Sequence, residues 1–210
     1  MKKFIIFDGP PASGKTTRSR ILARKLRCPY LRYKTLGFAN ILSTIIIRLA
    51  PGYSITRIKH LRTKEDPVLL LDSRLLSKMQ LIIFLAEIPY KILQVTLLIV
   101  LSLIYSCLII DEFLVLRIAN YVNVYLHGGL SKWHAELLIR IDLALLRVLA
   151  KHGTIQYIYI DRCIEELKNL WHKREFNKAY SETYLILVRL IWKTYQTEIS
   201  SLTRVKKIIR

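Results

Sequence analysis

The segment from Gly9 to Thr17 carries the clearest chemical pattern in the sequence. Two glycines, Gly9 and Gly14, stand five positions apart and are followed by Lys15 and Thr16. In this spacing, the P-loop pattern, backbone N–H groups surround a phosphate, the lysine neutralises phosphate oxygens and the threonine hydroxyl binds Mg²⁺. The pattern predicts an ATP site formed by residues Gly9, Pro10, Pro11, Ala12, Ser13, Gly14, Lys15, Thr16 and Thr17.

Two neighbouring acids, Asp111 and Glu112, end a short apolar run and could complete the chemistry. A carboxylate at the end of a buried strand can reach Mg²⁺ beside a triphosphate, and a second carboxylate can orient or deprotonate a nucleophile. We therefore assign Mg²⁺ binding to Thr16 and Asp111, and catalytic roles to Lys15 and Asp111. ATP and Mg²⁺ are the cofactors that these residues predict.

A third group of candidates is basic and follows the apolar run that ends at Asp161. Lys168, Lys173 and Arg174 could lie on a lid that closes over the phosphates and stabilises charge in the transition state. We place this lid at about residues 162–182 and name Arg174 as its catalytic candidate. A solvated basic helix face explains the same residues equally well, so both interpretations stay open.

The P-loop pattern needs a strand before it and a helix after it, and the periodicity predicts both. Residues 3–7 are β-rich, and apolar residues recur at helical spacing within residues 15–26. Further apolar runs predict strands at residues 30–34, 105–110 and 155–160. Between and beyond them we expect helices at residues 38–49, 68–101 with an interruption near Pro89, 135–151, 164–170 and 184–195.

Strands that alternate with helices form parallel sheets with right-handed crossovers. We expect an α/β protein with the three-layer P-loop NTPase fold, in which helices flank a parallel sheet of about five strands. Ligands bind at the carboxyl ends of such strands, and Asp8, Asp111 and Asp161 should share that edge. The length of 210 residues suits a single domain, 1–210.

The apolar middle of the chain allows a second interpretation. Residues 92–110 contain no charged side chain, and nineteen such residues are enough to span a membrane. However, Glu87, Lys91, Gln94 and Ser102 would share one face of a helix, which favours a helix packed on a protein core. We expect a buried helix followed by a core strand, with a membrane-embedded segment as the alternative.

Composition restricts the partners and the compartment. Lysine and arginine outnumber aspartate and glutamate by 34 to 15, so the net charge of +19 favours polyanions such as nucleotides, nucleic acid or an acidic membrane surface. The three cysteines are widely spaced and form no metal-binding pair, and the apolar start meets Asp8 too early for an export signal. We expect a cytoplasmic protein, and a homodimer stays open.

Residues 4–26, FIIFDGPPASGKTTRSRILARKL, resemble the opening of thymidylate kinases and related nucleoside monophosphate kinases. Residues 184–195, YLILVRLIWKTY, are similar to the segment that follows the lid in the same family. The resemblance implies a P-loop kinase fold, ATP as phosphoryl donor and Mg²⁺ as cofactor. It also implies a fifth strand, which in this chain would shrink to about residues 197–199.

The chain departs from the family on the acceptor side. Glu112 stands where the family has an arginine, and no Asp-Arg pair occurs near residues 87–90. An exchange of arginine for glutamate reverses the charge at a position that should contact an anion. The acceptor of the ATP γ-phosphoryl group is therefore expected to be a nucleoside monophosphate similar to dTMP, or a neutral nucleoside.

Two other functions remain compatible with the sequence. An ATPase or nucleotide-dependent switch that binds nucleic acid or an acidic membrane would use the same P-loop, the Asp111-Glu112 pair and the excess positive charge. A kinase-like fold that has lost catalysis would explain the missing arginines. We take the phosphotransferase as the leading hypothesis.

Overall fold

Five parallel strands form one sheet at the centre of the protein. The computed structural model describes residues 2–32, 36–53, 71–172 and 182–209. Within them the strand order is β2-β3-β1-β4-β5, with every neighbouring pair parallel. The strands are β1 (Lys3–Asp8), β2 (Tyr30–Arg32), β3 (Cys107–Asp111), β4 (Thr154–Asp161) and β5 (Arg204–Ile209). The predicted α/β class and the sheet of about five strands are confirmed.

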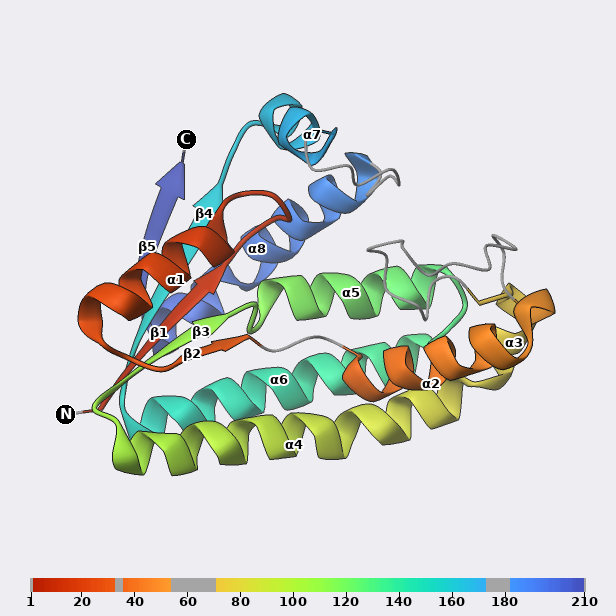
Figure 1. Ribbon diagram of the computed structural model, residues 1–210, viewed down its shortest axis with the longest axis horizontal. Coiled ribbons are helices and arrows are strands. Elements are labelled where there is room, and N and C mark those ends of the chain that lie inside the picture. Colours follow the sequence, from red (N-terminus) through yellow and green to blue (C-terminus); the bar gives the residue numbers. More distant parts are fainter. Residues whose placement is uncertain (1, 33–35, 54–70, 173–181, 210) are drawn as a thin grey trace.

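Helices cover both faces of this sheet unequally, as Figure 1 shows. Alternate residues of β1 face opposite sides: Ile5 and Phe7 pack in a small cluster with Ala23 of α1, whereas Phe4 and Ile6 belong to the main core beneath the other helices. The protein therefore has three layers. The helices are α1 (Lys15–Leu26), α2 (Gly37–Leu49), the 3₁₀ turn η1 (Pro51–Tyr53), α3 (Ser73–Lys78), α4 (Gln80–Ile104), α5 (Val115–Leu126), α6 (Lys132–His152), α7 (Ile164–His172) and α8 (Glu182–Leu202).

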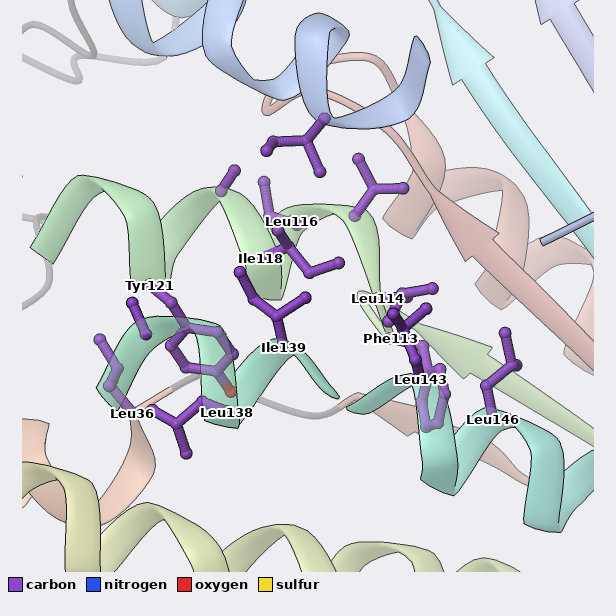
Figure 2. Packing of buried hydrophobic residues seen from close by; sticks show 14 of the residues in the cluster. Leu36, Phe113, Leu114, Leu116, Ile118, Tyr121, Leu138, Ile139, Leu143 and Leu146 are labelled. Atoms are coloured by element: carbon purple, nitrogen blue, oxygen red, sulfur yellow. The ribbon is translucent and has the colours of Figure 1, made fainter. Parts of the chain in front are cut away.

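The main core lies where α5 packs against α6 and the sheet. Figure 2 shows Tyr121 of α5 near Leu36 and Leu138, and Phe113 beside Leu143. All of these side chains are buried, and Leu36, Phe113, Tyr121 and Leu138 are completely so. Burial of this many large apolar groups supplies the main driving force for folding and holds the carboxyl edge of the sheet in place.

Helix α5 was not predicted, and its start depends on a residue far away in the sequence. The carboxylate of Asp8, at the end of β1, accepts hydrogen bonds from the backbone N–H groups of Leu114 (2.9 Å), Val115 (2.8 Å) and Leu116 (3.3 Å). The Tyr157 hydroxyl donates a further bond of 2.6 Å to it. Backbone N–H groups at a helix start need such an acceptor, so Asp8 caps α5. Its carboxylate lies next to the P-loop, but these four hydrogen bonds already occupy it.

Two predicted boundaries were wrong. Residues 197–199 continue helix α8, and the fifth strand is Arg204–Ile209. This strand pairs with β4 at the edge of the sheet, so backbone hydrogen bonds hold it and it needs no continuous apolar run.

The interruption expected near Pro89 is absent, because α4 is continuous from Gln80 to Ile104. Packing of α4 against α2 and α6 compensates for the N–H group that proline lacks.

Helix α4 confirms one prediction and adds an unexpected feature. The predicted shared face of Glu87, Lys91, Gln94 and Ser102 is confirmed, and this polar face is the buried one, since each of the four is at most 3% exposed. The core strand that should follow is β3. By length and composition alone, α4 is also the one described helix that could cross a membrane.

Inside the protein the charges of α4 meet partners from two other helices. The Lys91 ammonium forms an ion pair with Asp142 of α6, and Arg117 of α5 lies 3.1 Å from the other oxygen of that carboxylate. Tyr121 donates a 3.0 Å hydrogen bond to Glu87. Because buried charges need such compensation, these contacts fix which side of α4 faces inward.

Candidate nucleotide site

The P-loop connects β1 to α1 at the carboxyl edge of the sheet. Gly9 has a φ of 137°, and a Cβ added there would lie 2.1 Å from the carbonyl oxygen of Ile160. Gly14, with a φ of 89°, caps the amino end of α1. Both positions therefore require glycine. The loop presents the positive end of α1 together with backbone N–H groups, which is the arrangement that binds phosphate.

The remaining loop residues line this turn as the motif predicts. Pro10 accepts a 3.3 Å hydrogen bond from the Ser13 N–H, and Ala12 has a positive φ of 61°. Pro11 is half-buried, Ser13 is buried, and Thr17 is exposed on α1. The predicted binding segment is thus one continuous turn around the start of the helix.

Thr16 and Asp111 meet although 95 positions separate them. The Thr16 hydroxyl donates a 2.7 Å hydrogen bond to Oδ2 of Asp111, and the Tyr30 hydroxyl donates one of 2.8 Å to the same oxygen. Burial raises the pKa of the Asp111 carboxyl, and the nearby charge of Glu112 adds to this effect. Burial and Asp111 likewise raise the pKa of Tyr30 to about 12.

This pair suits a hard cation. The second oxygen of Asp111, Oδ1, is buried and has no hydrogen-bond partner among the described residues. A carboxylate oxygen and a threonine hydroxyl at the start of a P-loop helix are ligands that Mg²⁺ prefers. Because a cation would satisfy Oδ1 and offset the cost of burying the charge, the residues present fit Mg²⁺.

Lys15 faces the second acid of the pair. Its ammonium lies 3.4 Å from Oε1 of Glu112 and donates a 3.4 Å hydrogen bond to the Pro10 carbonyl oxygen. Glu112 also accepts two bonds from Arg32 of β2, at 3.1 Å from Nε and 2.9 Å from Nη2. One carboxylate therefore joins two cations at the end of the sheet.

The environment keeps Glu112 ionised. Burial alone would raise the pKa of its carboxyl, but the charge of Lys15 and the bonds from Arg32 outweigh burial and lower the pKa. The backbone of Glu112 has a φ of 66°, in the left-handed region that non-glycine residues rarely adopt. Its N–H donates to the Phe7 carbonyl oxygen at 3.0 Å, which ties this strained residue to β1. Strain of this kind is concentrated at functional sites.

A second arginine reaches the P-loop from the other side. Arg162, which directly follows Asp161 at the end of β4, donates a 3.1 Å hydrogen bond from Nε to the Ser13 carbonyl oxygen. Arg189 of α8 donates two 3.1 Å bonds to Asp161, and so fixes the end of β4. The P-loop thus has Lys15 within it and Arg162, from the end of β4, against its backbone.

Of the three basic residues predicted to lie on a lid, the structure describes only Lys168. Lys168 forms an ion pair with Glu182 between α7 and α8, and both side chains are about half exposed. This pair supports the interpretation of Lys168 as part of a solvated face. Lys173 and Arg174 lie outside the described residues, so the catalytic role of Arg174 stays a prediction.

Three site residues were missed by the sequence analysis, namely Tyr30, Arg32 and Arg162. A signal for each existed, because Tyr30 and Arg32 belong to a predicted strand and Arg162 follows the Asp161 that ends another. The carboxyl edge of the sheet was the expected place of the site, so polar residues at every strand end were candidates.

Comparison with known proteins identifies the fold. No protein-family model and no curated protein matches the sequence. A structure of deoxyadenosine kinase from M. mycoides with the products dCMP and dCDP aligns with a TM-score of 0.56 over 98% of this chain and 89% of that chain, at 14% identity. The same enzyme with dATP gives a TM-score of 0.53 over 99% and 90%, at 13% identity. The fold is that of the P-loop kinases.

Thymidylate kinase from Candida albicans also aligns, over 99% of this chain and 84% of that chain at 14% identity, with a lower TM-score of 0.45. The alignment with deoxyadenosine kinase confirms the resemblance seen in the sequence at the level of the P-loop kinase fold. At these identities the likeness establishes the architecture, and the activity has to be argued from the residues of this chain.

Proposed function

We propose that this protein transfers the γ-phosphoryl group of ATP to a hydroxyl group of a nucleoside. The observation that carries the proposal is the convergence of Lys15, Thr16, Asp111 and Glu112 at one P-loop. Lys15 and the loop N–H groups hold the phosphates, and Thr16 and Asp111 hold Mg²⁺. Bound there, Mg²⁺ supplies positive charge beside the phosphate oxygens.

Glu112 takes the role of the general base. The acceptor oxygen forms a bond to the γ-phosphorus while the bond to the bridging oxygen of ADP breaks, and the hydroxyl proton passes to the Glu112 carboxylate. A base must be ionised to accept this proton, and Lys15 and Arg32 keep Glu112 ionised. Arg32 acts as a positioning residue, because its two hydrogen bonds orient the carboxylate.

A neutral nucleoside fits this site better than a nucleoside monophosphate. Glu112 replaces the arginine that thymidylate kinases use at this position, and its charge would repel an acceptor phosphate. The two structures of deoxyadenosine kinase that align with TM-scores above 0.5 support a nucleoside acceptor. Nucleoside monophosphates similar to dTMP remain the second acceptor class to test.

Release of ADP from MgATP tests the proposal against a panel of nucleosides and nucleoside monophosphates. Acceptor-dependent turnover should be abolished by Lys15→Ala and retained by Lys25→Ala, which removes an exposed lysine from the same helix. Turnover with nucleosides, and none with monophosphates, is the expected result. Absence of turnover with every acceptor would overturn the assignment.

The same assay separates a second candidate, an ATPase or nucleotide-dependent switch. Glu112, next to Asp111, could orient water as readily as an acceptor hydroxyl, and this observation favours the candidate. ADP release that ignores every acceptor and increases with a polyanion would identify it. We retain the cytoplasm as the proposed compartment for either activity.

A further inference from the structure

Helix α4 differs from an ordinary surface helix, because its exposed side carries no charged residue. Its two charged side chains, Glu87 and Lys91, and the amide of Gln94 face the interior, and nine of its large apolar residues face outward. Four other apolar residues share the buried side, namely Ile83, Phe84, Val95 and Leu98. A surface helix of a water-soluble protein buries its apolar stripe and exposes its charges. Its exposed large apolar residues, between 43% and 71% accessible, are Leu81, Ile82, Leu85, Ile92, Leu93, Leu97, Val100, Leu103 and Ile104.

These residues fall on one side of the helix. At 100° per residue, the exposed apolar positions of α4 occupy a continuous arc of about half the circumference, and the buried positions occupy the other half. With 25 residues the helix is about 37 Å long, so this apolar arc runs along a whole edge of the molecule. Figure 1 shows α4 at the lower edge, with α2 beside its first half.

Helix α2 extends the same surface. Phe38, Ile41, Ile45 and Leu49 are exposed on one side of α2, which packs against α4. A groove of about 340 Å³ lies between the two helices, and its lining, which includes Leu42 and Ile83, is entirely apolar. We call the exposed apolar residues of both helices, together with this groove, the α2–α4 face. A continuous exposed apolar surface that extends over two helices marks a site of interaction.

Among the described residues, the exposed charged side chains within helices α2, α3 and α4 are all positive, and the carboxylate of Asp72, just before α3, is engaged in capping that helix. Helix α2 contains no acidic residue, and the single acidic residue of α4, Glu87, is buried. Arg48 is exposed on the same side of α2 as Ile45, and Arg74 and Lys78 are exposed on α3 just before α4 begins. An apolar surface with a basic border, on a chain with net charge +19, complements a surface that is apolar within and anionic at its boundary.

We propose that the α2–α4 face rests on an anionic lipid bilayer, with its apolar side chains inserted among the lipid chains and its basic border against the headgroups. A second copy of the chain is the less suitable occupant, because two molecules of charge +19 repel each other whereas anionic lipid neutralises the charge.

The helix lies along the bilayer and does not cross it. The inner side of α4 is committed to protein: Lys91 is paired with Asp142 of α6, and Glu87 accepts from Tyr121 of α5. The chain passes from α4 into β3, next to the central strand of the sheet, within three residues. Lipid therefore contacts α4 on its outer half alone, as in interfacial helices.

Vesicle flotation with the full-length chain tests this proposal. Phosphatidylcholine vesicles are compared with vesicles of phosphatidylcholine mixed with phosphatidylglycerol. The face variant is Leu85→Glu with Leu93→Glu. Its matched control is Leu190→Glu with Ile21→Glu, because Leu85 and Leu190 are both 55% exposed and Leu93 and Ile21 both 61%. Circular dichroism and thermal unfolding establish that each variant is folded.

The wild-type chain should float with the anionic vesicles, more weakly with the neutral ones and more weakly at high salt. The face variant should lose about tenfold or more in vesicle affinity, and the control variant should not. Lys15→Ala should bind vesicles like the wild type, so the result is independent of the proposed phosphotransfer. Equal binding by the face variant and its control overturns the proposal, as does a stable dimer in lipid-free buffer that the face variant dissociates.

Discussion

The hydroxyl of Thr16 and the carboxylate of Asp111 are joined by a 2.7 Å hydrogen bond that connects the start of α1 to the end of β3. This contact places the two proposed Mg²⁺ ligands side by side and leaves Oδ1 of Asp111 without a partner among the described residues. The carboxylate is completely buried, so its charge needs compensation. A cation held by Thr16 and Asp111 would supply it.

We therefore predict that Asp111→Asn lowers kcat by about 10²–10³-fold and raises the Mg²⁺ concentration needed for half-maximal activity. Steady-state rates over a Mg²⁺ titration measure both effects. Tyr30→Phe is the control, because it removes a different hydrogen bond to the same oxygen and keeps the negative charge. A similar loss in both variants would show that Asp111 acts through its hydrogen bonds and not as a metal ligand.

The pH dependence of activity should report the pairing of Glu112 with Arg32. Lys15 and Arg32 lower the pKa of Glu112 by stabilising the ionised form. Arg32→Gln removes part of this stabilisation, so the pKa rises and the acid limb of kcat/KM moves to higher pH. Activity at neutral pH should fall less than activity under mildly acidic conditions.

Arg20→Gln serves as the control for this prediction. Arg20 lies over the Tyr30 ring, 5.4 Å from its centroid, and makes no described hydrogen bond or ion pair with Glu112. Its removal takes a cation from the same region but should leave the acid limb in place. An unchanged pH profile in Arg32→Gln would exclude Glu112 as the base of the reaction.

The P-loop turn and the approach of Asp111 to it could be predicted because their signals are local or follow from topology. Gly9 to Thr17 is contiguous, and Asp111 ends an apolar run that must lie in a parallel sheet with its end at the ligand edge. The Arg32–Glu112 pair depends instead on the order β2-β3-β1, which places these two strand ends side by side. No spacing in the sequence shows that order.

Helix α4 shows a second limit of sequence analysis. The spacing of Glu87, Lys91, Gln94 and Ser102 predicts that they share one face, which the structure confirms. Periodicity cannot tell which face is inside, because this depends on Asp142 and Tyr121, which come from later helices. The start of α5 could not be predicted for a similar reason, because its capping carboxylate belongs to Asp8, more than 100 positions earlier in the sequence.

The buried carboxylate of Asp142 should be essential for stability. It pairs with Lys91 and Arg117, and all three side chains are at most 1% exposed. Asp142→Ala leaves two buried cations without their shared counter-charge, so we expect a loss of about 3–5 kcal/mol in the free energy of unfolding.

Urea unfolding followed by circular dichroism measures this loss, with Glu136→Ala as the control. Glu136 is a carboxylate of the same helix, but it is half-exposed and its contact with Lys132 spans 3.9 Å. Exposed pairs of this kind contribute little, so the control should change stability by less than about 1 kcal/mol. Equal, small losses in both variants would show that the buried cluster relaxes or admits water.

Gly9→Ala adds only one methyl group but should strongly weaken phosphate binding by the P-loop. The added methyl group would lie 2.1 Å from the Ile160 carbonyl oxygen, and the φ of 137° is unfavourable for alanine. The loop must then move away from β4, so the N–H groups no longer converge on one phosphate and ATP affinity should fall about tenfold or more. Titration with a fluorescent ATP analogue measures this loss.

Gly52→Ala is the control for this prediction, because a methyl group there meets no described atom within 4 Å. This variant should bind the ATP analogue like the wild type. Unaltered affinity in Gly9→Ala would mean that the phosphates are held elsewhere, which would contradict the assignment of the P-loop as the ATP site.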